Sequence, residues 1–201
     1  LDGRDHTDRP EPVERRLVSL TSEAVTLWKA LPWVGDVSPE LRTFAGALEA
    51  VGVKAGDEVI FESHAHPGGS IPWLNRARQQ GIVVRTFEPD ALSAEGNLER
   101  ISALIGPRTR VIQISHVTAP TGIVMPVKGI AKLAREKGCW FHVDGAQSAG
   151  MLNFSLREIG CDSYATSGHK WIGAPRETGL LFIRRDRIEE VAPTFVGAYT
   201  S

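Results

Sequence analysis

The stretch VKGIAKLAREKGCWFHVDGAQS, residues 127–148, combines the two patterns that decide the fold. Apolar residues in its first half follow the i, i+3, i+4, i+7 spacing of one helix face, which predicts a helix over 127–137. These residues are Val127, Ile130, Ala131 and Ala134. Gly138 suits the position just after a helix C-terminus, and the apolar run 139–144 predicts a strand. A helix followed directly by a strand is the repeating unit of an α/β sheet.

The same alternation continues on both sides of this stretch. Further short apolar runs predict strands at 58–63, 82–87, 111–115, 162–167 and 179–184. Two segments between them, 71–80 and 92–104, are expected to be helices. We therefore predict an α/β fold, a three-layer α/β/α sandwich with a mostly parallel central sheet. In such sheets ligands bind beyond the carboxyl ends of the strands.

Composition narrows the class of protein. The chain has 201 residues, of which 42% are hydrophobic and 23% charged, and its net charge is −1. Nucleic acids and anionic membranes favour basic partners, so neither is expected as a partner. No apolar run approaches the ~18–20 residues of a membrane span. With only two cysteines, Cys139 and Cys161, the chain suits a reducing compartment, and we expect it in the cytoplasm.

The N-terminal segment differs from the rest of the chain. Residues 1–16 carry nine Asp, Glu, Arg or Lys residues, with only Leu1 and Val13 as aliphatic residues. Such a segment cannot offset its ordering entropy by burial. We expect a charged, flexible arm.

Polar, chemically versatile side chains gather where the predicted strands end. Asp144 closes the run 139–144, and Lys170 follows the run 162–167. Histidines lie at or just inside such ends, namely His64, His66, His116, His142 and His169. An aspartate at a strand end is also typical of a turn cap, and a lone lysine is usually on the surface. It is the combination that predicts a site.

Two chemistries fit this set of residues. His64 with His66, and His142 with Asp144, are two residues apart and share a strand face, as zinc or iron ligands could. Alternatively, the Lys170 amine could hold a cofactor aldehyde. His142 lies between apolar neighbours, which is more typical of a buried structural histidine. The five tryptophans are expected mainly in the core; they are Trp28, Trp33, Trp73, Trp140 and Trp171.

Two short motifs resemble those of a known enzyme family. VDGAQ at 143–147, followed by SGHKW at 167–171, resembles the pyridoxal-phosphate signature of the class V aminotransferases. That family includes cysteine desulfurases and isopenicillin N epimerase-like enzymes. The segments HVTAPTG (116–122), GCDSY (160–164) and GAPRETG (173–179) resemble the epimerase-like branch.

The resemblance implies a role for each matching residue. Lys170 would be the Schiff-base lysine and, through a quinonoid, the group that moves the Cα proton. Asp144 would pair with the ring nitrogen of pyridoxal 5'-phosphate, and Gln147 would bond its phenolic oxygen. Ser167 and His169 would contact its phosphate.

Two more residues complete the implied site. His66 would stack on the cofactor ring, and Ser22 would contact the phosphate. The resemblance thus implies three catalytic residues, Lys170, Asp144 and His66, and no metal. It also implies a homodimer, and a division into the arm 1–16, a partial large cofactor domain 17–188 and, over 189–201, the start of a connection toward a C-terminal domain that the chain lacks.

Differences from the desulfurase pattern indicate the branch of the family. Desulfurases usually carry asparagine where this chain has Ala119, and neither Cys139 nor Cys161 matches their nucleophilic cysteine. We therefore expect a PLP-dependent, epimerase-like enzyme acting at Cα of an amino acid. The alternatives are a desulfurase-like or C–S lyase-like activity, or a non-catalytic remnant that binds the cofactor and dimerises.

Overall fold

The computed structural model describes residues 17–20, 23–29, 52–176 and 178–191, the first two ranges by their backbone alone. The expected arm 1–16, Ser22, Trp33 and residues 192–201 lie outside the described residues. The division of the chain into domains therefore stays a prediction.

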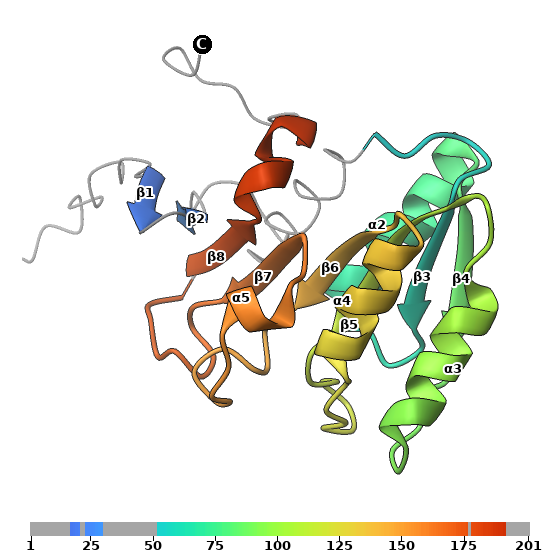
Figure 1. Ribbon diagram of the computed structural model, residues 1–201. Helices are drawn as coiled ribbons and strands as arrows, with labels where there is room; N and C mark the ends of the chain where they lie inside the picture. Colours follow the sequence, from blue (N-terminus) through green and yellow to red (C-terminus); the bar gives the residue numbers. More distant parts are fainter. Residues whose placement is uncertain (1–16, 21–22, 30–51, 177, 192–201) are drawn as a thin grey trace, which may run out of the picture.

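A single mixed sheet organises the described part of the chain (Figure 1), with the strand order β1-β2-β8-β7-β6-β5-β3-β4. The strands are β1 (Leu17–Leu20), β2 (Glu23–Lys29), β3 (Glu58–Glu62), β4 (Val83–Phe87), β5 (Thr109–Ser115), β6 (Trp140–Asp144), β7 (Ser163–Ser167) and β8 (Thr178–Ile183). From β7 to β4 all neighbours are parallel, whereas β8, β2 and β1 join antiparallel. The mostly parallel sheet predicted from the sequence is confirmed.

The connecting helices are α2 (Pro67–Gln80), α3 (Ala94–Leu104), α4 (Val127–Glu136) and α5 (Leu156–Ile159), and a 3-10 helix, η1 (Arg185–Glu190), follows β8. The expected helix 127–137 is confirmed, and Gly138 has the positive φ of 69° that its position requires. The helix expected at 71–80 starts four residues earlier in the structure, at Pro67, because His66 caps it and Pro67 occupies its first turn. Cys139 was expected within a strand but precedes β6.

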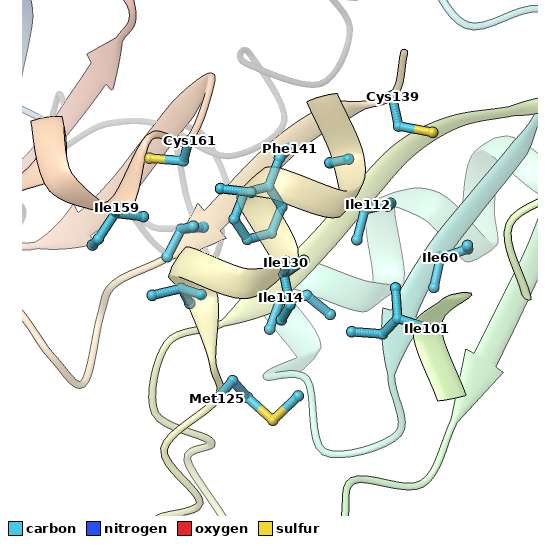
Figure 2. Close-up of a cluster of buried hydrophobic side chains, with 14 of the residues drawn as sticks. Ile60, Ile101, Ile112, Ile114, Met125, Ile130, Cys139, Phe141, Ile159 and Cys161 are labelled. Atoms are coloured by element: carbon cyan, nitrogen blue, oxygen red, sulfur yellow. The ribbon is translucent and has the colours of Figure 1, made fainter. Parts of the chain in front are cut away.

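Alternating residues of the central strands pack on opposite faces of the sheet. Val59 and Val111 join a cluster around Trp73 of α2. Their neighbours Ile60 and Ile112 face α3 and α4 in the larger cluster, which Figure 2 shows around Ile130. Helices thus cover both faces, which confirms the three-layer sandwich.

Parallel pairing brings the carboxyl ends of β3, β5, β6 and β7 to one edge of the sheet. Apart from Ser22, the site residues expected from the sequence lie at or after the ends of three of these strands: His66 after β3, Asp144 and Gln147 at β6, and Ser167, His169 and Lys170 at β7. None of the helices in the described ranges has the length and apolarity to cross a membrane.

The larger cluster should carry much of the stability. Ile112 is 0% exposed, so Ile112→Ala leaves a cavity and should lower the free energy of unfolding by about 2–5 kcal/mol in urea titrations. The control Leu92→Ala, at a side chain 97% exposed, should change it by less than about 0.5 kcal/mol. Equal losses in both variants would contradict this packing.

Candidate active site

The turn after β6 is fixed to β7 through the backbone of Gly145. Its carbonyl accepts hydrogen bonds from the hydroxyls of Thr166 (3.1 Å) and Tyr164 (3.3 Å) and from the N–H groups of Ser148 (2.9 Å) and Ala149 (3.0 Å). The Ser148 hydroxyl lies 3.3 Å from this oxygen and bonds the Tyr164 hydroxyl at 2.9 Å. The N–H of Gly145 donates to the carbonyl of Ala165 at 2.7 Å. The turn that begins at Asp144 is therefore held against the neighbouring strand.

Only glycine fits at position 145. A Cβ there would lie 1.8 Å from the ring of Tyr164. Burial raises the pKa of the Tyr164 hydroxyl, so this group stays protonated and can serve as a donor to the turn.

Asp144 is half-buried at the end of β6, and its carboxylate Oδ1 accepts from the N–H of Ala146 at 2.9 Å. The turn-cap role of a strand-end aspartate is thus present here, and it fixes the direction of the carboxylate. In the register of β6 and β7, Asp144 pairs with Ala165. Asp144 therefore lies one strand away from the segment that leads to Lys170.

Lys170 lies in the loop that joins β7 to the antiparallel β8. Ser167 ends β7 and is 1% exposed, while His169 and Lys170 are half-buried. Gly168 donates to the carbonyl of Thr178 at 2.8 Å and accepts from Ala174 at 2.8 Å. The base of the loop is therefore closed by backbone hydrogen bonds.

Gln147 contacts the lysine loop directly. The indole Nε1–H of Trp171 donates to Oε1 of Gln147 at 2.9 Å. Trp171 was expected in the core but is 56% exposed, which corrects that prediction, whereas Trp73 and Trp140 are buried as expected. The sequence pattern could not distinguish these cases, because a tryptophan beside a turn suits either environment.

His66 follows β3 as the N-cap of α2. Its Nδ1 accepts from the N–H of Gly68 at 3.0 Å. Since a backbone N–H can only donate, the proton of the neutral ring is on Nε2. The ring is half-buried and its direction is fixed by this cap.

A further carboxyl group, which the sequence motifs did not reveal, lies at the same edge of the sheet, with β5 between its strand and that of Asp144. Glu62 ends β3 and is 0% exposed, and its Oε1 accepts from the N–H of Ser115 at 3.1 Å. Its Oε2 has no hydrogen-bond partner among the residues described. Burial, together with the negative charge of Asp144, raises the pKa of Glu62 to about 7. A glutamate closing an apolar strand run was the signal available in the sequence.

The residues of the metal hypothesis have other contacts. His64 contacts Thr121 through Nδ1 (2.9 Å) and Glu88 through Nε2 (2.7 Å). His142 is 0% exposed, bonds Ser163 through Nδ1 at 2.7 Å, and burial lowers its pKa to about 3. Within the described ranges, no three His, Cys, Asp or Glu side chains group as metal ligands would.

The cysteines are free and buried. Burial raises the pKa of the Cys139 thiol, which disfavours the nucleophilic thiolate. Cys161 precedes β7, as expected.

Comparison with known proteins tests the resemblance to the class V aminotransferases. The class-V aminotransferase family model matches residues 37–201. The chain is 40% identical over 163 residues to an isopenicillin N epimerase of Streptomyces clavuligerus, covering 80% of this chain and 40% of that protein. It is 37% identical over 170 residues to a probable cysteine desulfurase of Pseudomonas aeruginosa, covering 80% and 42%. The chain thus spans about two fifths of the length of these relatives.

Solved structures agree. A cystine C–S lyase in complex with its product cysteine persulfide matches with a TM-score of 0.73 and 29% identity, over 86% of this chain and 44% of that one. A mutant of that lyase, with glycine covalently linked to the PLP cofactor, matches with a TM-score of 0.72 and 29% identity, over 86% and 44%. These matches confirm the resemblance read from the motifs and support pyridoxal phosphate as the cofactor.

The raised pKa of Glu62 predicts a pH dependence of stability. Between the ordinary value of 4.5 and about 7, the folded chain keeps a proton that the unfolded chain releases. The contribution of Glu62 to the free energy of unfolding should therefore fall as the pH rises through this window, by about 3 kcal/mol in total. Glu62→Gln, which mimics the protonated carboxyl, should remove that slope in urea titrations at several pH values.

The matched control is Glu99→Gln, at an exposed glutamate of α3, which should keep the wild-type slope. If Glu62→Gln also kept it, Glu62 would not hold its proton in the folded chain.

Proposed function

Because the chain belongs to the class-V aminotransferase family, we propose that it binds pyridoxal phosphate through Lys170 and acts at Cα of an amino acid. The observation that carries the proposal is the pairing of two loops. Asp144 and Gln147 follow β6, and Ser167 to Lys170 follow the adjacent β7. The hydrogen bond from Trp171 to Gln147 joins these loops at 2.9 Å.

The chemistry of these side chains fits the cofactor. A carboxylate suits a protonated ring nitrogen, an amine suits an aldehyde, and hydroxyl and imidazole groups suit a phosphate. In the proposal Asp144, Lys170, and Ser167 with His169 fill these roles. Ser22, outside the described residues, is the further phosphate contact expected from the motifs.

When bound, pyridoxal phosphate supplies an electron sink for the electron pair left at Cα after a proton is removed. Asp144 keeps the proton on the ring nitrogen, because an adjacent carboxylate favours the positively charged form. The Lys170 amine, once neutral, removes and returns the proton at Cα. His66, whose ring direction is fixed by its cap on Gly68, supports the cofactor ring by stacking.

The epimerase-like reaction is the finer part of the proposal. It is supported by the identity to the Streptomyces relative, by Ala119, and by two buried cysteines that lie before strands and outside the lysine loop. Cleavage of a C–S bond is the second candidate, and the similarity to the cystine lyase supports it. Both reactions begin with the same proton removal, so Lys170 and Asp144 have the same roles in each.

The assembly and location are also part of the proposal. We propose a homodimer, as the family resemblance implies, and Ile71 and Leu74 of α2, which are 54% and 51% exposed one helical turn apart, are candidate contacts in it. Free, buried cysteines suit a reducing compartment, hence the cytoplasm. Residues 17–188 would be the cofactor domain. Sedimentation of the purified chain measures the oligomeric state.

The first test is covalent trapping. The chain is mixed with pyridoxal phosphate, reduced with borohydride and digested, and peptide mass spectrometry should place the cofactor on Lys170. Lys170→Arg keeps the positive charge but its guanidinium stays protonated, so it should give no adduct. A wild-type chain without an adduct, or with one on another lysine, would refute the proposal.

The second test concerns Asp144. In D₂O with a panel of L-amino acids, NMR should show exchange of the Cα proton, and Asp144→Asn should slow it by about a hundredfold or more because the ring nitrogen loses its charged partner. The control Asp186→Asn, in η1, should leave the rate unchanged.

The same measurement separates the candidate functions. Inversion at Cα indicates the epimerase-like reaction, and sulfide or persulfide release from cysteine or cystine indicates C–S cleavage. Trapping on Lys170 without exchange of any amino acid would favour the non-catalytic alternative and contradict the proposed reaction.

A further inference from the structure

We propose that Trp171 is a positioning residue, which orients the Gln147 side chain so that its amide nitrogen faces the cofactor. This inference rests on the proposed function, in which Gln147 bonds the phenolic oxygen of pyridoxal phosphate. The family motif assigns no role to Trp171, so the inference adds a residue to the site.

The argument starts from hydrogen-bond chemistry. An indole has one N–H and no acceptor, whereas a glutamine amide has an acceptor end and a donor end. The contact of 2.9 Å between Nε1 of Trp171 and Oε1 of Gln147 therefore fixes which end faces the indole. The amide Nε2 is left as the donor on the other side. A donor is what an anionic phenolic oxygen requires.

Backbone packing fixes the two ends of this contact. A Cβ on Gly150 would lie 2.7 Å from the backbone oxygen of Trp171, so the two loops meet main chain to main chain at this point. Gly150 also has a φ of 83°, which favours glycine. On the lysine side, the N–H of Gly173 donates to the carbonyl of Lys170 at 3.1 Å.

Burial does not account for the position of Trp171. The residue is 56% exposed, and the apolar contact of a half-buried indole would not by itself select the direction of its N–H. The directional bond of the indole N–H is the contact that distinguishes this tryptophan from other apolar residues. Because Trp171 directly follows Lys170, the same loop places the reactive amine and orients the glutamine.

The expected effect appears in the spectrum of the cofactor-loaded chain. An N–H donated to the phenolic oxygen withdraws part of its negative charge, which would otherwise hold a proton on the adjacent nitrogen linking cofactor and lysine. Trp171→Phe removes the bond that orients the donor. The pKa at which the visible absorbance band changes should therefore rise, by about one pH unit, the size expected for one hydrogen bond to an ionised oxygen.

Matched variants separate positioning from general packing. Gln147→Ala should raise this pKa at least as much, and Trp171→Phe with Gln147→Ala should add nothing further, because Trp171 acts through Gln147. Gln147→Glu keeps an acceptor for the indole but lacks the N–H and adds a negative charge, so it should raise the pKa at least as much as Gln147→Ala. The control Ile172→Ala, at the exposed next residue, should leave the pKa unchanged.

A second readout needs no cofactor. In the ligand-free chain, hydrogen exchange of the Trp171 indole N–H, assigned by comparison with Trp171→Phe, should be faster in Gln147→Ala than in wild type. It should remain slow in Gln147→Glu.

Two results would overturn the inference. One is equal indole exchange in wild type and Gln147→Ala. The other is an unchanged pKa in Trp171→Phe, or additive effects in the double variant, while Lys170 still traps the cofactor. Failure of wild-type trapping refutes the proposed function instead, and the exchange experiment then still decides whether the indole holds the glutamine.

Discussion

The hydrogen bonds from β7 to the carbonyl of Gly145 are the interaction on which the rest of the site depends. Two hydroxyl groups from β7 and two backbone N–H groups converge on this one oxygen. A turn leaving a parallel strand is otherwise free to follow many directions. Here the convergence holds the turn against β7, which places the backbone that carries Asp144 before the turn and Gln147 within it. The absence of a side chain at position 145 is what lets Tyr164 approach.

Below this turn, the sheet buries polar groups that are hydrogen-bonded to one another. Ser163 accepts from Trp140 at 2.8 Å and contacts His142 at 2.7 Å, and Trp73 donates to Gln113. A buried polar group is costly when it lacks a partner, and a satisfied network is rigid. These bonds join β6 to β7 and β5 to α2, so neither pair of elements can slide past its partner without breaking them.

The sequence predicted the fold, and it predicted which strand ends carry the candidate site residues, for identifiable reasons. The apolar residues of 127–137 recur with the period of a helix because one face of that helix is buried. The apolar runs before Asp144 and Ser167 reflect strands buried on both faces. Both patterns can be read from a short stretch of sequence. The reversal of β8 and the role of Trp171 could not be read in the same way, because both depend on which segments meet in space. Glu62 lies between these cases. Its burial could be anticipated from the strand run, but its proximity to Asp144 depends on the strand order. The roles of Lys170, Asp144, Gln147, Ser167, His169 and His66 toward a cofactor stay predictions.

The closed base of the lysine loop has an evolutionary consequence. Gly168 is bonded to both Thr178 and Ala174, so the position of Lys170 is set by the base of the loop. Ile172 and residues 175–176 are exposed, whereas Gly173 has a φ of 70° that favours glycine. This outer part of the loop can therefore diversify between related proteins while the reactive amine stays in place. A fold with such an arrangement can acquire new substrates by changing the rim of its site without altering the chemistry at its centre.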